Sequence, residues 1–178
     1  MMRSSSRVLY ENPKIWESSP PDTVHERVSL TITAVPSDVR TILEVGSGNG
    51  QLIDTLYKAG YDPIALDISF NSLKLINSSK RVQSEASILP FPPNSFDLVL
   101  AFELLEHIPN STFSSVLDEI SKVARKYIII TVPFRERLEW NYARSFGDDE
   151  LKYLFNGFKC IDLRKIVNVL HPDRTISL

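Results

Sequence analysis

The feature that most constrains the fold of this chain is a regular alternation of short apolar runs and helical segments that begins at Thr41. TILEV, YDPIALDI, FDLVLAFE and KYIIITVP are apolar runs of strand length, and the segments between them carry apolar residues at helical spacing. Runs that are apolar throughout indicate strands buried on both faces. The alternation therefore predicts a mostly parallel sheet covered by helices on both faces, which is a three-layer α/β/α sandwich of the Rossmann-like type.

The start of the chain differs from this regular part. Its first 22 residues are rich in Ser and Pro, and residues 24–35 are consistent with a helix. We predict that residues 1–35 form an N-terminal arm with a lead-in helix and that residues 36–178 form the sandwich domain. Tyr10 and Trp16 in the arm leave two interpretations open, a lid that folds over a site or hydrophobic anchors for the arm.

Composition excludes several functional classes. A chain of 178 residues with 43% hydrophobic residues can bury one full core, and its net charge of −2 gives no broad positive field for nucleic-acid binding. Its single cysteine, Cys160, cannot form an internal disulfide, which suits a reducing compartment. The sequence has no apolar run of membrane-spanning length and no signal-peptide pattern at its start, so we expect a cytoplasmic location. It makes no prediction about oligomeric state.

Half of the glycines lie in one short loop. The chain has six glycines, and Gly46, Gly48 and Gly50 fall within five residues, between a predicted strand and a predicted helix. Glycine lets a ligand approach bare backbone, and N–H groups at a helix start can face it. The spacing is G-x-G-x-G, whereas a nicotinamide cofactor normally requires G-x-G-x-x-G, so the loop argues against an NAD-dependent oxidoreductase.

Polar residues follow the other predicted strands. Asp67 ends the second strand, where its carboxylate could accept the hydroxyl groups of a ribose or cap the next helix. Glu85 and Ala86 follow the third strand, and FELLEH closes the fourth. Ligands of such sheets bind beyond the carboxyl ends of the strands, so we expect these residues and the glycine loop to lie at one edge.

In this order and spacing, ILEVGSGNG, LDIS, SEASILPFPPNSFDLVLAFELLEHI and IIITVP resemble the class I S-adenosylmethionine-dependent methyltransferases over about residues 38–160. The resemblance implies S-adenosyl-L-methionine as cofactor and methyl transfer to a small-molecule acceptor, such as a lipid, a glycan or another metabolite. The alternative is a non-catalytic or regulatory binding protein on the same scaffold. The family's sheet usually ends with two strands after the last helix, whereas only one is evident here, at about residues 158–170. We therefore expect that the sheet lacks its last strand or that a partner completes it.

The resemblance also implies roles for individual residues. It places the methionine part of the cofactor on the glycine turn, the ribose at the second strand, the adenine after the third strand, and the amino and methyl groups beside the fourth. The implied cofactor-binding residues are Glu44, Gly46, Ser47, Gly48, Asp67, Ile68, Glu85, Ala86, Phe102 and Glu103. The family often has Gly-Asp-Ala where this chain has Ser84-Glu85-Ala86, so the longer glutamate would reach the adenine with a different geometry.

A hydroxyl acceptor would need a base, and Glu103 and His107 are the candidate catalytic residues. His107 could equally be a structural residue of the first turn. Glu103-x-x-Glu106-His107 also resembles the metal cluster of methyltransferases that modify the terminal ribose 2′-hydroxyl of small RNAs. Those enzymes need a further histidine after the fifth strand, and no histidine lies between His107 and His171. We therefore predict no metal.

The loop after the fifth strand is the candidate acceptor region. Arg135, Trp140 and Tyr142 in the segment RERLEWNYAR could hold an anionic or sugar-like acceptor through charge and ring stacking. A solvent-exposed surface helix is the alternative interpretation.

Overall fold

The computed structural model describes residues 21–134, 144, 146–155, 157–163, 165–167 and 175–177. Its helices are α2 (Pro21–Thr33), α3 (Gln51–Lys58), α4 (Phe70–Leu73), the 3-10 turn η2 (Leu105–His107), α5 (Phe113–Val123) and α6 (Asp148–Lys152). Its strands are β1 (Ile42–Val45), β2 (Ile64–Asp67), β3 (Arg81–Gln83), β4 (Phe96–Phe102), β5 (Ala124–Phe134), β6 (Lys165–Val167) and β7 (Thr175–Ser177). No helix in the described ranges is long and apolar enough to cross a membrane.

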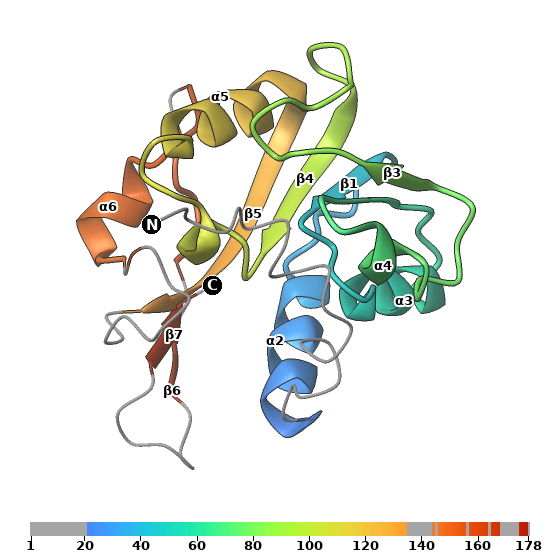
Figure 1. The fold of residues 1–178 in the computed structure, drawn as a ribbon. Helices are drawn as coiled ribbons and strands as arrows, with labels where there is room; N and C mark the ends of the chain where they lie inside the picture. The colour runs from blue at the N-terminus through green and yellow to red at the C-terminus, as the bar shows by residue number, and fades with distance from the viewer. Residues whose placement is uncertain are drawn as a thin grey trace, which may run out of the picture.

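The strands form one sheet in the order β3-β2-β1-β4-β5-β7-β6, which runs across Figure 1 from β3 on the right to β6 and β7 at the lower left. The first five of these strands pair in parallel, whereas β7 is antiparallel to both β5 and β6. The predicted α/β sandwich with a mostly parallel sheet is therefore confirmed. Because chain order reverses between β1 and β4, the carboxyl ends of these two strands flank the expected ligand position.

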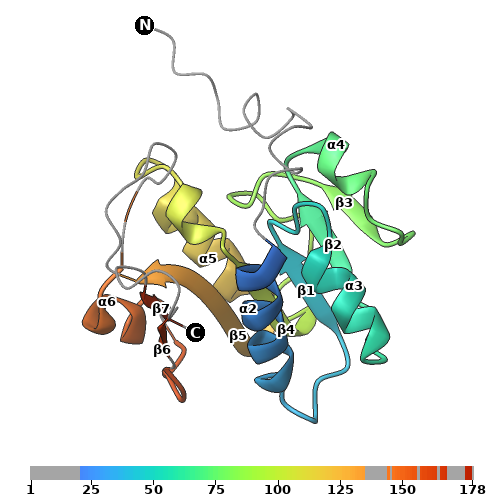
Figure 2. The ribbon, with the colours of Figure 1, turned by 90° about the horizontal axis from the view of Figure 1, so that it is seen from below.

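Helices cover both faces of the sheet, and strand β4 shows why. Leu98 and Leu100 lie in the buried cluster that also receives α2 and α3, whereas Val99 and Ala101 lie in the cluster that receives α5. Successive side chains of a strand point to opposite faces, so an apolar strand such as FDLVLAF can fill both layers. Figure 2 shows α2 and α3 on one side of β1, β4 and β5, with α5 on the other.

The expectation of a missing last strand is wrong. β7 pairs through Val132↔Ser177 with β5 and through Ile166↔Ile176 with β6, so it fills the position between them. The strand predicted over residues 158–170 is also shorter, because only Lys165–Val167 is a strand among the described residues there. Three-residue strands are too short to show a clear alternation of apolar and polar residues, which explains why the sequence pattern did not reveal β7.

Asp97, near the start of β4, holds three segments together. Its Oδ2 accepts hydrogen bonds from the backbone N–H groups of Arg40 and Thr41 at 3.0 and 3.2 Å, and its Oδ1 accepts from Arg125 Nη2 at 2.8 Å. Burial would raise the pKa of this carboxyl, but the hydrogen bonds from Arg40, Arg125 and Thr41 outweigh it and hold the pKa well below its usual range. Asp97 therefore ties the entry to β1 and the start of β5 to β4.

The glycine turn between β1 and α3 requires left-handed backbone and leaves no room for a side chain. Gly46 has φ 76, and a Cβ added there would lie 2.7 Å from Leu104 Cδ1. Gly50 has φ 87, and its added Cβ would lie 2.7 Å from Ile76 Cγ1. The glycines thus allow the turn to pack directly against the segments that follow β4 and α4.

We expect Asp97→Asn to lower the midpoint of thermal unfolding at neutral pH, because it removes the charge that binds Arg125. The pKa of Asp97 is depressed in the folded state, so its contribution is present above the unfolded pKa of about 3.9 and is lost as the pH falls through the folded value. The difference in midpoint from wild type should therefore shrink below about pH 4. Asp54→Asn, at an exposed position of α3, is the control. A constant difference from neutral pH to pH 3 would contradict this.

Gly46→Ala should cost more stability than Gly60→Ala. Both residues have positive φ, so alanine at either position costs about 1–2 kcal/mol of backbone strain. A Cβ at Gly60 meets nothing within 4 Å, whereas at Gly46 it meets Leu104, which should add about 1–3 kcal/mol of overpacking. Urea unfolding measures both losses, and equal losses would show that Leu104 does not restrict the turn.

Candidate functional site

The turn after β1 is attached to β2 by two backbone hydrogen bonds. The N–H groups of Gly46 and Ser47 both donate to the carbonyl oxygen of Leu66, at 2.8 and 3.0 Å. The backbone then passes through a left-handed conformation at Gly48, with φ 51. The Ser47 hydroxyl is buried and has no hydrogen-bond partner among the described residues. The turn therefore presents backbone and an unpaired hydroxyl at the carboxyl edge of the sheet.

Asp67, at the end of β2, contacts this turn directly. Its Oδ2 accepts from the N–H of Gly48 and its Oδ1 from the N–H of Ser69, both at 2.8 Å. Burial raises the pKa of Asp67, and the backbone hydrogen bonds from Ser69 and Gly48 partly oppose that rise. The local backbone contact that the capping interpretation predicts, between Asp67 and Ser69, is thus present. A carboxylate has about four acceptor positions, so both oxygens can accept further hydrogen bonds, and the ribose role stays a prediction.

Glu44 is a second buried acid beside the turn. Its side chain is only 2% exposed, and its Oε2 has no hydrogen-bond partner within the described ranges. Burial raises the pKa of Glu44 well above its usual range, and the nearby charge of Asp67 raises it further. A buried carboxyl with an unpaired oxygen is costly for a folded protein, so this residue marks a position where a binding partner would be stabilising.

Glu103 follows β4 and has an unusual backbone. Its φ of 51 lies in the left-handed region, and its N–H donates to the carbonyl oxygen and to Oγ1 of Thr131 on β5, both at 3.0 Å. Its Oε2 lies 3.1 Å from Nη1 of Arg27 on α2. Burial raises the pKa of Glu103, whereas the charge of Arg27 and the hydrogen bond from Thr131 oppose the rise. Strained non-glycine residues concentrate at functional sites, which favours such a role here.

The segment after β3 lies beside the end of β2. The N–H of Ser84 donates to the carbonyl oxygen of Asp67 at 3.1 Å, and Nε2 of Gln83 donates to the carbonyl oxygen of Ile68 at 3.1 Å. Glu85, the next residue, is exposed, and Ala86 is half-buried. The structure therefore brings the proposed ribose and adenine residues to adjacent strand ends.

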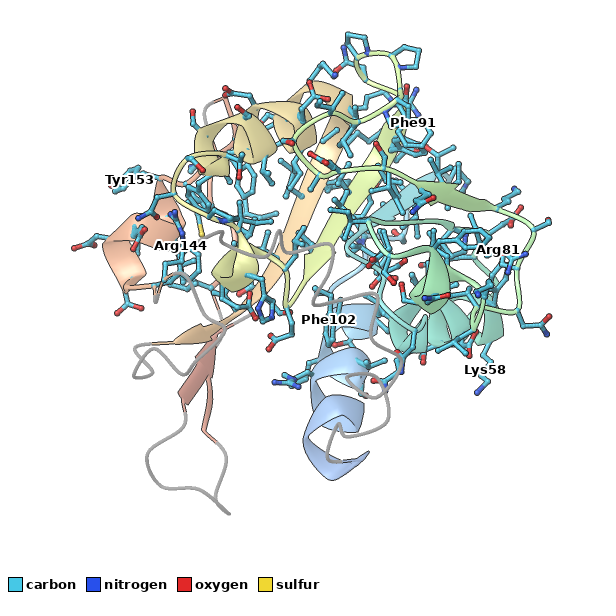
Figure 3. All side chains as sticks on the ribbon, viewed as in Figure 1. Lys58, Arg81, Phe91, Phe102, Arg144 and Tyr153 are labelled. Atoms are coloured by element: carbon cyan, nitrogen blue, oxygen red, sulfur yellow. The ribbon has the colours of Figure 1, made fainter. Side chains whose placement is uncertain are left out.

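The tip of β4 carries the remaining candidates. Phe102, labelled in Figure 3, packs against the cluster that contains Val28 of α2. His107 lies on η2 with its Nε2 3.9 Å from Oε1 of Glu106, whose side chain is only 1% exposed. His107 is half-buried. Its position directly after β4 is compatible with either role predicted for it, so catalysis by Glu103 and His107 stays a prediction.

The predicted acceptor residues are only partly placed. Arg135, Trp140 and Tyr142 lie outside the described residues. Arg144, which belongs to the same segment, has its guanidinium carbon 3.2 Å from the ring centroid of Phe113 and donates from Nη2 to Oδ1 of Asn110. It lies on the α6 side of the molecule with Tyr153, far from Arg81 and Lys58 (Figure 3). Arg144 is therefore held against the start of α5.

Sequence reasoning missed Arg27 and Thr131. Arg27 lies 76 residues before Glu103, and nothing in the apolar spacing of the lead-in helix indicates a polar contact at that distance. Thr131 is the one polar residue in the otherwise apolar run IIITV. A threonine inside a fully buried strand is a usable signal, because its hydroxyl needs a partner. In the part of the chain that is described, no three His, Cys, Asp or Glu residues are grouped so that they could hold a metal ion.

The family model for a methyltransferase domain matches residues 43–130, slightly less than half of the chain. The chain is 31% identical over 80 residues to a ubiquinone biosynthesis O-methyltransferase of Xanthomonas euvesicatoria, which covers 40% of this chain and 34% of the relative. It is 33% identical over 95 residues to an uncharacterised protein of Methanocaldococcus jannaschii, with 51% and 40% covered. The chain thus spans between a third and two fifths of the length of these curated relatives.

Solved structures share the fold over most of the chain. A S-adenosylmethionine-dependent methyltransferase from Archaeoglobus fulgidus superposes with a TM-score of 0.70 at 20% identity, covering 89% of this chain and 76% of that one. The 1,6-didemethyltoxoflavin-N1-methyltransferase of Burkholderia thailandensis, solved with S-adenosylhomocysteine, gives 0.73 at 20% identity, covering 88% and 77%. By sequence over residues 43–130 and by fold over most of its length, the chain is similar to S-adenosylmethionine-dependent methyltransferases.

Proposed function

We propose that this protein transfers the methyl group of S-adenosyl-L-methionine to a small-molecule acceptor. The observation that carries the proposal is a group of buried polar atoms near the glycine turn that have no hydrogen-bond partner among the described residues. These atoms are Oε2 of Glu44, Oγ of Ser47, Oε1 of Glu103 and Nε of Arg27. Unpaired buried polar atoms are rare in folded proteins, and their concentration at one strand edge favours a polar ligand there. Three acceptors and one donor suit the ammonium, sulfonium and carboxylate groups of this cofactor.

The proposed roles follow the strand ends. The glycine turn would hold the methionine part, Asp67 the ribose, and the segment after β3 the adenine. The residues proposed to contact the cofactor are Glu44, Gly46, Ser47, Gly48, Asp67, Ile68, Glu85, Ala86, Phe102 and Glu103. When bound, the cofactor supplies the reactive sulfonium methyl group. The protein orients the acceptor in line with it and excludes water, and positioning of this kind can lower a barrier by about 7–11 kcal/mol.

The buried carboxyl groups of the site favour the binding of a positively charged group. Glu44, Asp67 and Glu103 are all buried or largely buried carboxyls, and burial raises the pKa of each. A positive charge placed among them would stabilise their ionised forms, because opposite charges within a few ångströms favour ionisation. S-adenosylmethionine carries a sulfonium charge that its demethylated product lacks. The same carboxyls would therefore favour the substrate over the product.

The acceptor is proposed at the level of chemical class only. The relatives bear the names of enzymes that act in ubiquinone biosynthesis and on 1,6-didemethyltoxoflavin, which supports a small metabolite. We propose His107, with Glu103, as the base for a hydroxyl acceptor and Arg135, Trp140 and Tyr142 as acceptor contacts. The case for a non-catalytic scaffold rested on a missing last strand, and β7 removes that argument.

We expect Asp67→Asn to weaken binding of S-adenosylhomocysteine by about 10- to 100-fold, because hydrogen bonds to a charged group contribute about 1.5–3 kcal/mol. Isothermal titration calorimetry at neutral pH measures the change. Asp54→Asn, an exposed carboxyl on α3, is the matched control and should bind as wild type does. Wild-type protein that gives no heat with either S-adenosylmethionine or S-adenosylhomocysteine, or that binds NAD instead, would overturn the proposal.

Glu44→Gln should raise stability and lower the preference for the charged ligand. The pKa of Glu44 is raised in the folded state, so its ionisation opposes folding once the pH exceeds the unfolded value of about 4.3. The variant should therefore melt at a higher temperature than wild type at pH 7. Its ratio of affinities for S-adenosylmethionine over S-adenosylhomocysteine should fall. A lower melting temperature with an unchanged ratio would show that Glu44 has only a structural role.

A further inference from the structure

An ion pair joins helix α2 to the tip of β4. Nη1 of Arg27 lies 3.1 Å from Oε2 of Glu103, and both side chains are only 18% exposed. The next residue of α2, Val28, is buried in the cluster that contains Leu52 and Leu56 of α3. The arginine therefore extends from a firmly packed part of α2, and its guanidinium reaches a fixed position beside the candidate site.

The other member of the pair is held just as firmly. Glu103 has φ 51, and the two hydrogen bonds from its N–H to Thr131 fix this left-handed backbone against β5. A non-glycine residue in this conformation costs about 1–3 kcal/mol and persists only when its surroundings impose it. The hydrogen bonds to β5 thus hold the backbone from which the side chain of Glu103 extends.

Each group of the pair retains one unused polar atom. Oε1 of Glu103 and Nε of Arg27 are both buried, and neither has a hydrogen-bond partner among the described residues. The pair is therefore incomplete as a structural salt bridge, since leaving buried polar atoms unsatisfied is costly. Oε1 of Glu103 thus remains available as an acceptor, while Oε2 is paired with the arginine.

The charge of Arg27 also affects whether Glu103 is ionised. The influences on Glu103 are its burial, which favours the neutral acid, and the charge of Arg27 and the hydrogen bond from Thr131, which favour the carboxylate. Among the described residues, Arg27 is the cation that forms an ion pair with Glu103. Removal of the guanidinium would therefore remove the largest of the influences that oppose burial.

We propose that Arg27 is a positioning residue of the methyltransferase site, which keeps Glu103 ionised and directs its second oxygen at a cationic group of the ligand. This inference rests on the proposed function. It assigns a role in cofactor binding to helix α2, which lies outside the matched methyltransferase domain over residues 43–130. Arg27 does not itself need to touch the ligand for this role.

The test compares Arg27→Met and Arg27→Lys with a matched control, Lys58→Met, which removes an exposed cation from α3. S-adenosylmethionine affinity is measured by calorimetry from pH 5 to pH 8. We expect Arg27→Met to lose about tenfold in affinity at pH 7, since a charged hydrogen bond is worth at least that much. The loss of affinity toward acid should begin at a higher pH than in wild type. Arg27→Lys should retain most of the affinity at pH 7 and most of the wild-type pH dependence. Lys58→Met should change neither the affinity nor its pH dependence.

A double-mutant cycle with Glu103→Gln separates this role from simple packing. If Arg27 acts through Glu103, Arg27→Met has no further effect on affinity in the Glu103→Gln protein. Independent, additive losses would overturn the inference. So would an Arg27→Met protein whose pH dependence of affinity matches that of wild type.

A ligand-free measurement keeps the inference apart from the proposed function. The side-chain carboxyl of Glu103, assigned in the NMR spectrum by its absence in Glu103→Gln, should titrate at a higher pH in Arg27→Met than in wild type. An unchanged titration would overturn the inference whatever the protein binds. If the titration shifts but wild type binds no S-adenosylmethionine, the proposed function fails. Arg27 would then still keep Glu103 ionised, but the proposal that it directs Glu103 at the ligand would fail as well.

Discussion

The carboxylate of Asp67 is the contact on which the geometry of the site depends. Its two oxygens accept hydrogen bonds from Gly48 in the glycine turn and from Ser69 at the start of α4. One short side chain at the end of β2 thus connects the turn after β1, the end of β2 and the helix that follows. The turn has no side chains of its own at its glycines to hold it in place. It depends on this carboxylate and on the carbonyl oxygen of Leu66 for its position.

The site concentrates groups that reduce the stability of the ligand-free protein. Glu44 and Glu103 each have a buried oxygen with no partner in the part of the chain that the structure describes, and Glu103 also has a left-handed backbone. A core built only for stability would place apolar side chains at such positions. By contrast, Asp97 at the opposite end of β4 has every oxygen engaged and a lowered pKa. At one end of β4, therefore, both oxygens of a carboxylate are paired, whereas at the other end Glu103 keeps one oxygen without a partner among the described residues.

The sequence pattern predicted the parallel part of the sheet because long apolar strands and amphipathic helices give strong periodic signals. The runs that became β1, β4 and β5 are mostly apolar, and α3 and α5 have clear buried faces. β3, β6 and β7 have three residues each, which is too few for a period to be recognised. The edge that carries the candidate site could be predicted because its residues lie at or just after the ends of strands. The contact between Arg27 and Glu103 could not, since it depends on how α2 packs against the finished sheet.

The position of β7 between β5 and β6 has a consequence for synthesis of the protein. Residues 175–177 must enter a gap between strands made earlier, so the sheet cannot be completed until this late segment has emerged from the ribosome. Until then the edge of β5 exposes unpaired backbone groups, which can pair with another nascent chain. A polypeptide that ends before this segment would contain the parallel part of the sheet, but the edge of β5 would remain unpaired and prone to aggregation.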